Sequence, residues 1–463
     1  MTESQKIESR KIVGRKPPSA GGLPGIGVLY RMPQDPLGLL REVSARFPEI
    51  AFLGHARGQD FYLLNKAEYC KYVFQDNNKN YLRGSQGDFL KPLLGNGLAT
   101  SEGDFWRSQR RLMQPAFHRR TLRTMVSTMT GEINSMLMRW DEYAESGRPL
   151  DISKELVRLT VRIIIKTMCS QEVLENPESV EHDLSEVLDF LYPRQFNPLS
   201  LPVSWPTPKN QRYRASLRSI HHLVEQLVAE RYNNYFDTGD LLSMLILARD
   251  PLTGQGMDRS QLHDELLTIL MAGYETTSSA LNWLWYLLAQ HPEAVEKLQG
   301  EADCVLTGRI PTVDDLQYLM YTEMAFKEAM RLYPPVWMNA RVCQQDDVID
   351  GYRIPKNACV FICPYTMHRH PEYWDDPLRF DPERFNTMNA SERPRFAYQP
   401  FGGGPRLCIG KHFAEMESKL AISMIAQRFS LKMIPGQEIL PKPDLTLRSR
   451  PGIQMTIHRR KGG

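Results

Sequence analysis

The sequence lacks several features that would place it in a common class of protein. No stretch of its 463 residues approaches the roughly 18 consecutive apolar residues of a membrane-spanning helix, and its N-terminal part has no apolar core of a signal peptide. The motifs HExxH, Gly-x-Ser-x-Gly and the P-loop are also absent. The net charge of +3 is too small to indicate a nucleic-acid-binding protein. We therefore expect a cytoplasmic protein with no transmembrane anchor and no nucleic-acid partner.

Cysteine is scarce and irregularly placed. The seven cysteines form no Cys-x-x-Cys pair and their number is odd, which argues against a disulfide framework and favours a reducing compartment. Cys408 differs from the others because it lies in a glycine-rich loop, two residues after an arginine and directly before a helical pattern. An arginine and a helix N-terminus both favour the thiolate, which is the metal-binding form of cysteine. The alternative is a buried structural cysteine, which is common among free cysteines.

The composition and the lack of repeats indicate one large folding unit. Hydrophobic residues make up 42% of the chain and charged residues 24%, as in globular proteins. A basic segment followed by prolines and glycines opens the chain, and we expect residues 1–30 to be flexible. No linker interrupts the remainder, so residues 31–463 are predicted to form a single catalytic domain.

Helical periodicity dominates the middle of the chain. Residues 257–289 contain no proline, are rich in large apolar side chains, and begin with a possible capping pair, Asp258 and Gln261. A helix of this length, ~45–50 Å, would cross the whole protein. Strand-like segments are short and far apart in the sequence, at residues 51–53, 61–64, 353–354 and 359–362, with a hairpin expected over 445–447 and 453–457. The sequence therefore predicts a mainly α fold with a small β portion.

Residues 401–410, Phe-Gly-Gly-Gly-Pro-Arg-Leu-Cys-Ile-Gly, are the most informative part of the sequence. Their spacing, Phe-x-x-Gly-x-Arg-x-Cys-x-Gly, resembles the haem-ligand loop of the cytochrome P450 family. The resemblance implies the cytochrome P450 fold, with a long central helix over a haem b that is held by a cysteine loop. It also implies that Cys408 is the iron ligand and that Phe401, Arg406 and Gly410 contact the cofactor.

Inside the long helix, residues 272–277 read Ala-Gly-Tyr-Glu-Thr-Thr. Gly273 lowers the bulk of the helix where a flat cofactor could lie, and Thr276 can donate to a carbonyl one turn back and open the helix. The stretch resembles the oxygen-activation motif of the family, which implies that Glu275 and Thr276 are catalytic residues that relay protons. Taken alone, the segment would be better explained as a polar notch in a long core helix, but its position upstream of Cys408 favours the motif.

Two further patterns resemble structural motifs of the family. Glu328 and Arg331 match its Glu-x-x-Arg helix motif, and Arg384 lies in a segment similar to its Pro-Glu-Arg-Phe loop. The resemblance implies that these three residues form a buried charge network that braces the haem-binding core. An ion pair on a helix surface is the ordinary alternative for such spacing.

The resemblance also supplies partners for the two haem propionates. Trp106 and Arg110 match the Trp-x-x-x-Arg helix of the family, while Arg341 and Arg406 fit its other two propionate-binding positions. His368 could be mistaken for a metal ligand, but the resemblance makes it a structural or propionate-side residue.

The implied activity is that of a haem-thiolate monooxygenase, which uses O2 to hydroxylate or epoxidise a lipophilic substrate such as a fatty acid, terpenoid or polyketide-like compound. About 55 residues follow Cys408, too few for a flavin or nicotinamide domain. We therefore expect a monomer that receives electrons from a separate ferredoxin with its ferredoxin reductase, or from a flavodoxin-type donor. Basic residues could form a docking face, or simply a solvated helix face: Arg107, Arg110, Arg111, Arg119 and Arg120.

Two segments that interrupt the helical pattern match the substrate-pocket walls of the family, residues 83–104 and 192–208, although ordinary surface loops would look similar. Two other functions stay open. One is a peroxide-driven enzyme of the same fold, which would not need the acid and alcohol at positions 275 and 276. The other is a non-catalytic haem sensor or carrier, which would need no proton relay.

Overall fold

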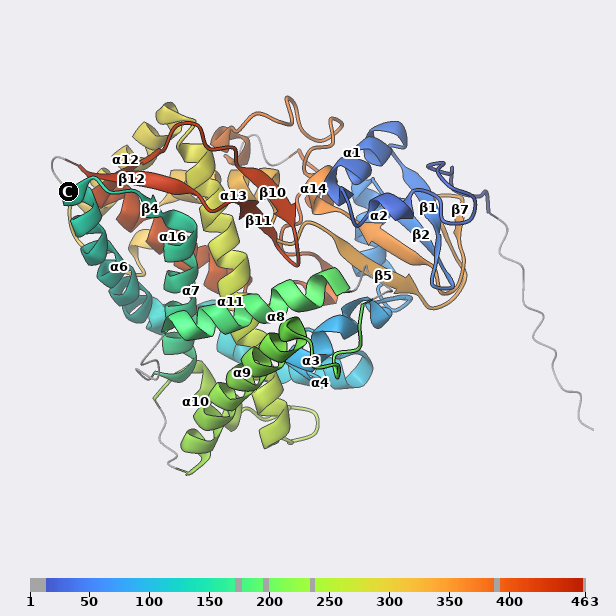
Figure 1. The fold of residues 1–463 in the computed structure, drawn as a ribbon, viewed down its shortest axis with the longest axis horizontal. Helices are drawn as coiled ribbons and strands as arrows, with labels where there is room; N and C mark the ends of the chain where they lie inside the picture. The colour runs from blue at the N-terminus through green and yellow to red at the C-terminus, as the bar shows by residue number, and fades with distance from the viewer. Residues whose placement is uncertain (1–13, 171–176, 195–199, 234–237, 387–391, 461–463) are drawn as a thin grey trace, which may run out of the picture.

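The computed structural model describes residues 14–170, 177–194, 200–233, 238–386 and 392–460. Most of the helices gather on one side of the molecule, and the largest sheet lies at the opposite end (Figure 1). This arrangement confirms the predicted mainly α fold with a small β portion. The α-helices of the described residues are α1 (Pro36–Arg46), α2 (Ala67–Lys71), α3 (Lys91–Leu94), α4 (Gly103–Met113), α5 (Arg119–Leu122), α6 (Val126–Ser146), α7 (Ile152–Cys169), α8 (Pro177–Arg194), α9 (Pro208–Asn233), α10 (Leu241–Leu247), α11 (Arg259–Leu288), α12 (Pro292–Leu306), α13 (Met320–Leu332), α14 (Pro364–Met367) and α16 (Lys411–Arg428).

The strands are short and come from distant parts of the chain, as predicted. The largest sheet has five strands in the order β1-β2-β8-β5-β3, and only β2 and β8 pair in parallel within it. This sheet joins segments near both ends of the chain. The strands are β1 (Ile50–Ala56), β2 (Gln59–Leu64), β3 (Tyr81–Leu82), β4 (Leu150–Asp151), β5 (Asn339–Cys343), β6 (Asp347–Ile349), β7 (Tyr352–Ile354), β8 (Cys359–Ile362), β9 (Phe429–Met433), β10 (Leu440–Pro443), β11 (Leu447–Arg450) and β12 (Gln454–Arg459).

The long central helix is α11, and it begins and ends within two residues of the predicted bounds. Its N-cap, Asp258, accepts a hydrogen bond from the backbone N–H of Gln261 at 2.8 Å, which confirms the capping pair. The 30 residues of α11 span ~45 Å and run through the middle of the molecule (Figure 1). The helix packs along α7, where Thr160 donates to the carbonyl of Tyr274 at 3.1 Å. The helix is continuous through residues 272–277, so the expected local opening is not seen.

The C-terminal strands pair differently from the prediction. The expected hairpin of residues 445–447 with 453–457 does not form, because β11 pairs with β10 while β12 pairs with β9 and β4. Pro451 lies between the two segments and has no N–H to donate to a ladder. Beyond it, Ile453 is bound through its N–H to the hydroxyl of Ser153 at 2.9 Å, which directs β12 toward the start of α7.

The segment before α1 is more ordered than the sequence suggested. Residues 14–30 lie on the edge of the largest sheet, where Phe52 donates to Pro18 at 2.8 Å and Ala20 donates back to Phe52 at 2.9 Å. Ala20 and Val28 are also buried. The expected flexibility of residues 1–30 therefore does not hold for residues 14–30, and residues 1–13 lie outside the described chain. None of the described helices combines the length and apolar character needed to cross a bilayer.

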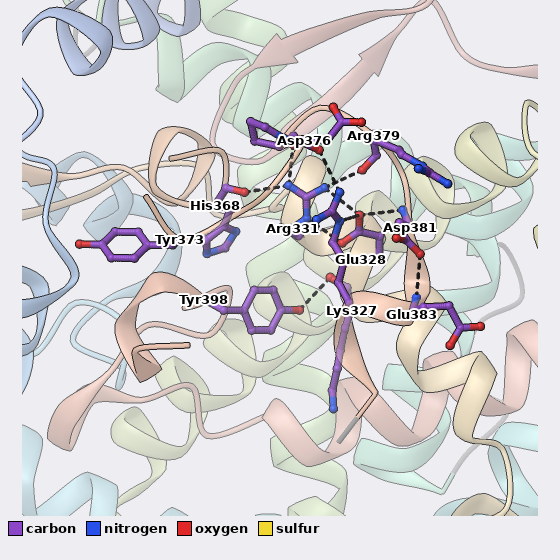
Figure 2. A network of polar contacts seen from close by, with 12 residues as sticks. Lys327, Glu328, Arg331, His368, Tyr373, Asp376, Arg379, Asp381, Glu383 and Tyr398 are labelled. Atoms are coloured by element: carbon purple, nitrogen blue, oxygen red, sulfur yellow. Dashed lines mark hydrogen bonds and ion pairs between the residues drawn. The ribbon is translucent and has the colours of Figure 1, made fainter. Parts of the chain in front are cut away.

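A buried charge network ties α13 to the segment that precedes the cysteine loop (Figure 2). The carboxylate of Glu328 binds Arg331 through two hydrogen bonds of 2.6 and 2.7 Å, and both side chains are fully buried. Arg384 approaches Glu328 at 3.6 Å, so the structure brings the three predicted residues together. The three side chains thus form a buried network and not an exposed pair, and its role in bracing a haem-binding core stays a prediction.

The same network holds loop backbone in place. Arg331 donates to the carbonyls of His368 and Pro377 at 2.9 and 2.7 Å, and Glu328 accepts from the N–H of Asp381 at 2.9 Å. Burial raises the pKa of Glu328 even though Arg331 lowers it. The pair therefore contributes mainly by fixing loops, since a buried ion pair gains little over its desolvation cost.

Candidate active site around Cys408

A cavity of about 230 Å³ lies where α11, α16 and the loop of residues 400–410 meet. Its wall contains Cys408 on one side and Thr276 of α11 on another. The lining includes five residues predicted from the sequence to contact the cofactor: Arg341, Phe401, Arg406, Cys408 and Gly410. The structure thus brings together residues that are far apart in the chain.

The glycines of the cysteine loop let the loop backbone pack closely against neighbouring residues of the protein. Gly404 has φ +65°, and a Cβ there would lie 1.7 Å from the carbonyl oxygen of Phe74. A Cβ on Gly403 would lie 2.4 Å from the ring of Phe396. The loop is closed by the N–H of Cys408, which donates to Phe401 at 3.0 Å. These contacts fix the position from which the Cys408 sulfur faces the cavity.

The thiolate-stabilising partners of Cys408 differ in part from the prediction. Burial raises the pKa of Cys408, while the backbone N–H of Gly410, the Arg110 guanidinium and the N–H of Lys411 act in the opposite direction. The helix N-terminus therefore contributes as expected. Arg406 does not, because its guanidinium binds Glu102 and the carbonyl of Ser101 instead. The arginine that acts on Cys408 is Arg110, 298 positions earlier in the sequence.

Half-buried arginines lie in and beside the cavity wall, and Arg341 and Arg406 line it. Burial, together with repulsion from Arg83 and Arg406, lowers the pKa of Arg341 to about 9. Burial also lowers the pKa of Arg110, and lowers that of Arg406 to about 10. A guanidinium keeps its proton, so these shifts reflect positive charges in a partly desolvated place, where an anionic ligand would be favourable.

Trp106 belongs to the same region. It lines a second cavity that shares Arg341 and Arg406 with the first, and the Arg406 guanidinium lies 4.2 Å from the centre of its indole ring. The cations, the facing thiol and the two adjoining cavities fit a flat iron cofactor that carries carboxylates. Arg83 was not predicted from the sequence, because it lies in an irregular loop without a motif around it.

Thr276 lies on the cavity wall, and its hydroxyl donates to the carbonyl of Ala272 at 2.9 Å, which confirms the predicted bond one turn back. Gly273 also lines the cavity, but a Cβ there would clash with Ile164 of α7 at 2.8 Å. The glycine is therefore needed for the packing of α11 on α7, and its expected role in the approach of a cofactor stays a prediction.

Glu275 is directed away from the cavity. It is not among the lining residues, and its carboxylate binds Arg448 of β11 at 2.6 and 2.9 Å and accepts from Thr446 at 2.5 Å. Although burial raises its pKa, Arg448 and Thr446 hold the pKa of Glu275 below its ordinary value. The structure therefore places the predicted acid and the predicted alcohol of the relay on different sides of α11.

His368 is structural in this fold. Its side chain is fully buried, and its ring accepts a hydrogen bond from the backbone N–H of Gln399 at 2.9 Å. Burial lowers its pKa to about 3, with repulsion from Arg331 adding to the effect, so the ring is neutral. Within the described ranges, no group of three or more His, Cys, Asp or Glu side chains could hold a metal ion.

The two expected pocket walls differ in what they contribute. Leu98, from residues 83–104, lines the cavity. No described residue of 192–208 does so, and residues 195–199 of that segment lie outside the described chain. The two segments nevertheless touch, since the rings of Phe89 and Tyr192 lie 6.3 Å apart edge to face.

The basic docking face is smaller than the sequence suggested. Arg110 is half-buried and interacts electrostatically with Cys408, and Arg111 binds the fully buried carboxylate of Asp250 at 2.7 Å. Arg107 pairs with Asp104. Two exposed arginines of α5, Arg119 and Arg120, could still contact an acidic partner. Arg119 also contacts the ring of His412 at 3.4 Å.

Comparison with known proteins agrees with this geometry. The sequence model of the Cytochrome P450 family matches residues 17–457. Cyclooctatin synthase from Streptomyces melanosporofaciens is 35% identical, with 93% of each chain covered. Cyclooctat-9-en-7-ol 5-monooxygenase from the same organism is 35% identical over 90% of this chain and 89% of its own. The crystal structure of the cytochrome P450DA heme domain superimposes with a TM-score of 0.88 at 25% identity, covering 97% of this chain and 99% of that one. The chain belongs to the cytochrome P450 family and is a P450 monooxygenase.

Proposed function

We propose that this monooxygenase hydroxylates or epoxidises a cyclic, terpenoid-like alkene or alkenol, with O2 and two electrons from a separate donor. The observation that carries the proposal is the cavity in which the Cys408 thiol and the Thr276 face of α11 border one space. The balanced reaction takes substrate, O2, two electrons and two protons to the oxygenated product and water. The chain must therefore supply a thiolate, a dry pocket and a route for protons.

Haem b is the proposed cofactor, with Cys408 as its iron ligand. When bound, the haem-thiolate supplies the chemistry that activates O2. Arg110, Arg341 and Arg406, with Trp106, would hold its carboxylates, because burial disfavours the positive charge of each arginine and an anionic ligand would offset that effect. Phe401 and Gly410 line the cavity beside the sulfur and would shield it from water.

Protons are the part of the reaction that the chain controls directly. The Thr276 hydroxyl can hold a proton donor against α11, since it is already fixed by its bond to Ala272. Glu275 is the proposed acid of the relay. In this structure its carboxylate is bound by Arg448, so it would first have to leave that ion pair.

The proposed substrate class rests on the apolar residues of the cavity wall and on the name of one relative. The cavity side formed by α11, α13 and neighbouring segments is apolar, with Leu98, Ile269, Phe326, Met330 and Val336. Such a surface suits a hydrocarbon skeleton. The relative cyclooctat-9-en-7-ol 5-monooxygenase is named for a cyclic substrate with one double bond and one hydroxyl group. A compound of that kind would fit an apolar wall with few polar groups.

A separate ferredoxin with its reductase, or a flavodoxin, is the proposed electron donor, and we propose that the enzyme works as a monomer. One observation favours a second possibility: Glu275 does not face the cavity, and a peroxide-driven enzyme would not need it there.

Turnover under two conditions tests the proposal. Purified holoenzyme is incubated with a panel of cyclic alkenes and alkenols, either with O2, reductant and a ferredoxin system or with hydrogen peroxide alone. Oxygenated product that depends on O2 and the ferredoxin supports the proposal. Product formed only with peroxide would support the second possibility. A protein that binds haem but forms no product under either condition would support the function of a haem sensor or carrier.

A further inference from the structure

The wall segment, residues 91–98, consists of α3 and the four residues after it. The helix α3 lies beside α9 and α11 (Figure 1). Leu98, the last residue of the wall segment, lines the cavity that contains Cys408. Residues 95–98 belong to no helix or strand, so their position depends on contacts with the side chains of neighbouring helices.

Two adjacent acids of α11 hold the backbone of the wall segment. The Asp264 carboxylate accepts a hydrogen bond from the N–H of Asn96 at 2.7 Å, and the Glu265 carboxyl group accepts one from the N–H of Leu98 at 2.9 Å. Gly95 has φ +53°, and a Cβ there would lie 2.2 Å from the Asp264 carboxylate. The backbone of the wall segment therefore lies directly on α11.

Glu265 is fully buried and has no cation as a partner among the described residues. Other buried acids of the described chain, such as Glu132, Glu155 and Glu275, are paired with arginine. The second contact of Glu265 is with the side-chain amide of Gln261 at 2.6 Å. This distance suits an acid hydroxyl that donates to an amide oxygen better than an amide N–H that donates to a carboxylate.

The surroundings of Glu265 favour its neutral form. A carboxylate that is buried without a cation loses its hydration and gains no ion pair in return. Burial raises the pKa of Glu265 to about 7, although the N–H of Leu98 and the amide of Gln261 oppose the shift. The negative charge of Asp264 adds to the rise. Glu265 therefore changes its charge near neutral pH.

The other titratable groups near the wall segment are engaged differently. His221 of α9 contacts the carbonyl oxygen of Pro92 at 3.2 Å and stacks on His263, with ring centres 5.2 Å apart. Burial lowers the pKa of His221, so this ring is neutral where Glu265 titrates. The charged residues on the adjoining helices have partners of their own: Lys91 with Asp88, Arg259 with Glu225, and Arg231 with Asp240.

We propose that Glu265 is a positioning residue that holds Leu98 in the cavity wall while it is protonated and releases the wall segment when it is ionised. Residues 95–98 carry no charge, so their displacement lets water reach the ionised carboxylate without breaking an ion pair of their own. The inference deepens the proposed function, because it takes the cavity as the substrate pocket. The pocket should therefore bind substrate more tightly below pH 7 than above it.

Hydrogen–deuterium exchange of the haem-loaded protein tests the release without any substrate. In the wild type, the protection of the backbone amides of residues 95–98, corrected for the intrinsic exchange rate, should fall roughly 10–30-fold from pH 6.5 to pH 8.5. The reason is that an acid with a pKa of about 7 is neutral in only about one molecule in 30 at pH 8.5.

Two variants assign that change to Glu265. Glu265→Gln keeps the shape of the side chain but cannot ionise, so residues 95–98 should stay protected at both pH values. His263→Gln is the matched control, because it removes the other titratable side chain of this contact, and it should keep the wild-type loss of protection. Equal wild-type protection at the two pH values would overturn the inference whether or not the variants fold, and so would the same loss in Glu265→Gln.

Binding of cyclododecanol, a neutral cyclic alcohol, tests the consequence for the pocket. The apparent Kd, measured from the change in haem absorption, should rise roughly 10–30-fold from pH 6.5 to pH 8.5 in the wild type. In Glu265→Gln it should stay constant within about twofold, so that at pH 8.5 the variant binds the alcohol more tightly than the wild type. A purely structural role of Glu265 would weaken binding in the variant at every pH and would contradict the inference.

The outcomes separate this inference from the proposed function. A wild type that oxygenates cyclic alkenols but shows no pH-dependent protection of residues 95–98 would refute the role of Glu265 and leave the oxygenase function intact. A wild type that shows the pH-dependent protection, and loses it in Glu265→Gln, but makes no product with O2 and reductant would refute the proposed function and support the release of the wall segment.

Discussion

Neutralising Glu328 should remove much of the stability of the fold. Glu328→Gln keeps the shape of the side chain but leaves the Arg331 guanidinium fully buried without its counter-charge. Breaking a buried ion pair on one side typically costs ~3–5 kcal/mol. A folded domain has only ~5–15 kcal/mol of stability to lose. The loss should also free the loop around Asp381, whose N–H donates to Glu328 at 2.9 Å, and so loosen the approach to the cysteine loop.

Denaturant unfolding and haem content together measure this effect. We expect Glu328→Gln and Arg331→Ala to be recovered as haem-poor or insoluble protein, with a lower unfolding midpoint where any is soluble. Glu383→Gln is the matched control, because Glu383 lies in the adjoining turn and its bond to Lys297 is exposed. That change should cost no more than about 1 kcal/mol. Haem-replete Glu328→Gln protein that unfolds at the wild-type denaturant midpoint would show that the charge network does not stabilise the fold to this extent.

Three further changes test individual residues. Cys408→Ser should abolish the absorption band of the reduced, CO-bound form that is typical of a thiolate ligand, and a surviving band would assign the ligand to another cysteine. Thr276→Ala should still bind haem and substrate but release more peroxide per electron pair, and unchanged coupling would show the hydroxyl to be dispensable. Burial raises the pKa of Glu265 to about 7, above its unfolded value of about 4.5, so its contribution of roughly 3 kcal/mol is complete below pH ~4.5 and is lost as the pH rises through ~7. The unfolding free energies of the wild type and of Glu265→Gln should therefore converge as the pH rises through ~7. Parallel pH profiles of the two unfolding free energies would contradict the raised pKa of Glu265.

Features that depend on local sequence patterns could be predicted from the sequence. The bounds of α11 follow from a proline-free apolar run that starts at an Asp258 cap, and the Glu328–Arg331 pair follows from their spacing on one helix. The pairing of β11 with β10 could not be predicted, because strand partners depend on distant segments.

The electrostatic partners in the site could not be predicted for the same reason. Which face of α11 the Glu275 carboxylate occupies is decided by Arg448, which lies 173 positions later in the sequence. Likewise, spatial proximity makes Arg110 the cation at Cys408, whereas sequence proximity suggested Arg406.

The fate of isotopically labelled O2 tests the central claim most directly. Holoenzyme, reductant and a ferredoxin system are incubated with a cyclic alkenol under labelled O2, and the product mass is measured. The proposed function predicts one labelled oxygen atom in each product molecule. Unlabelled product, or product formed equally well from peroxide without O2, would contradict a monooxygenase that takes its oxygen from O2.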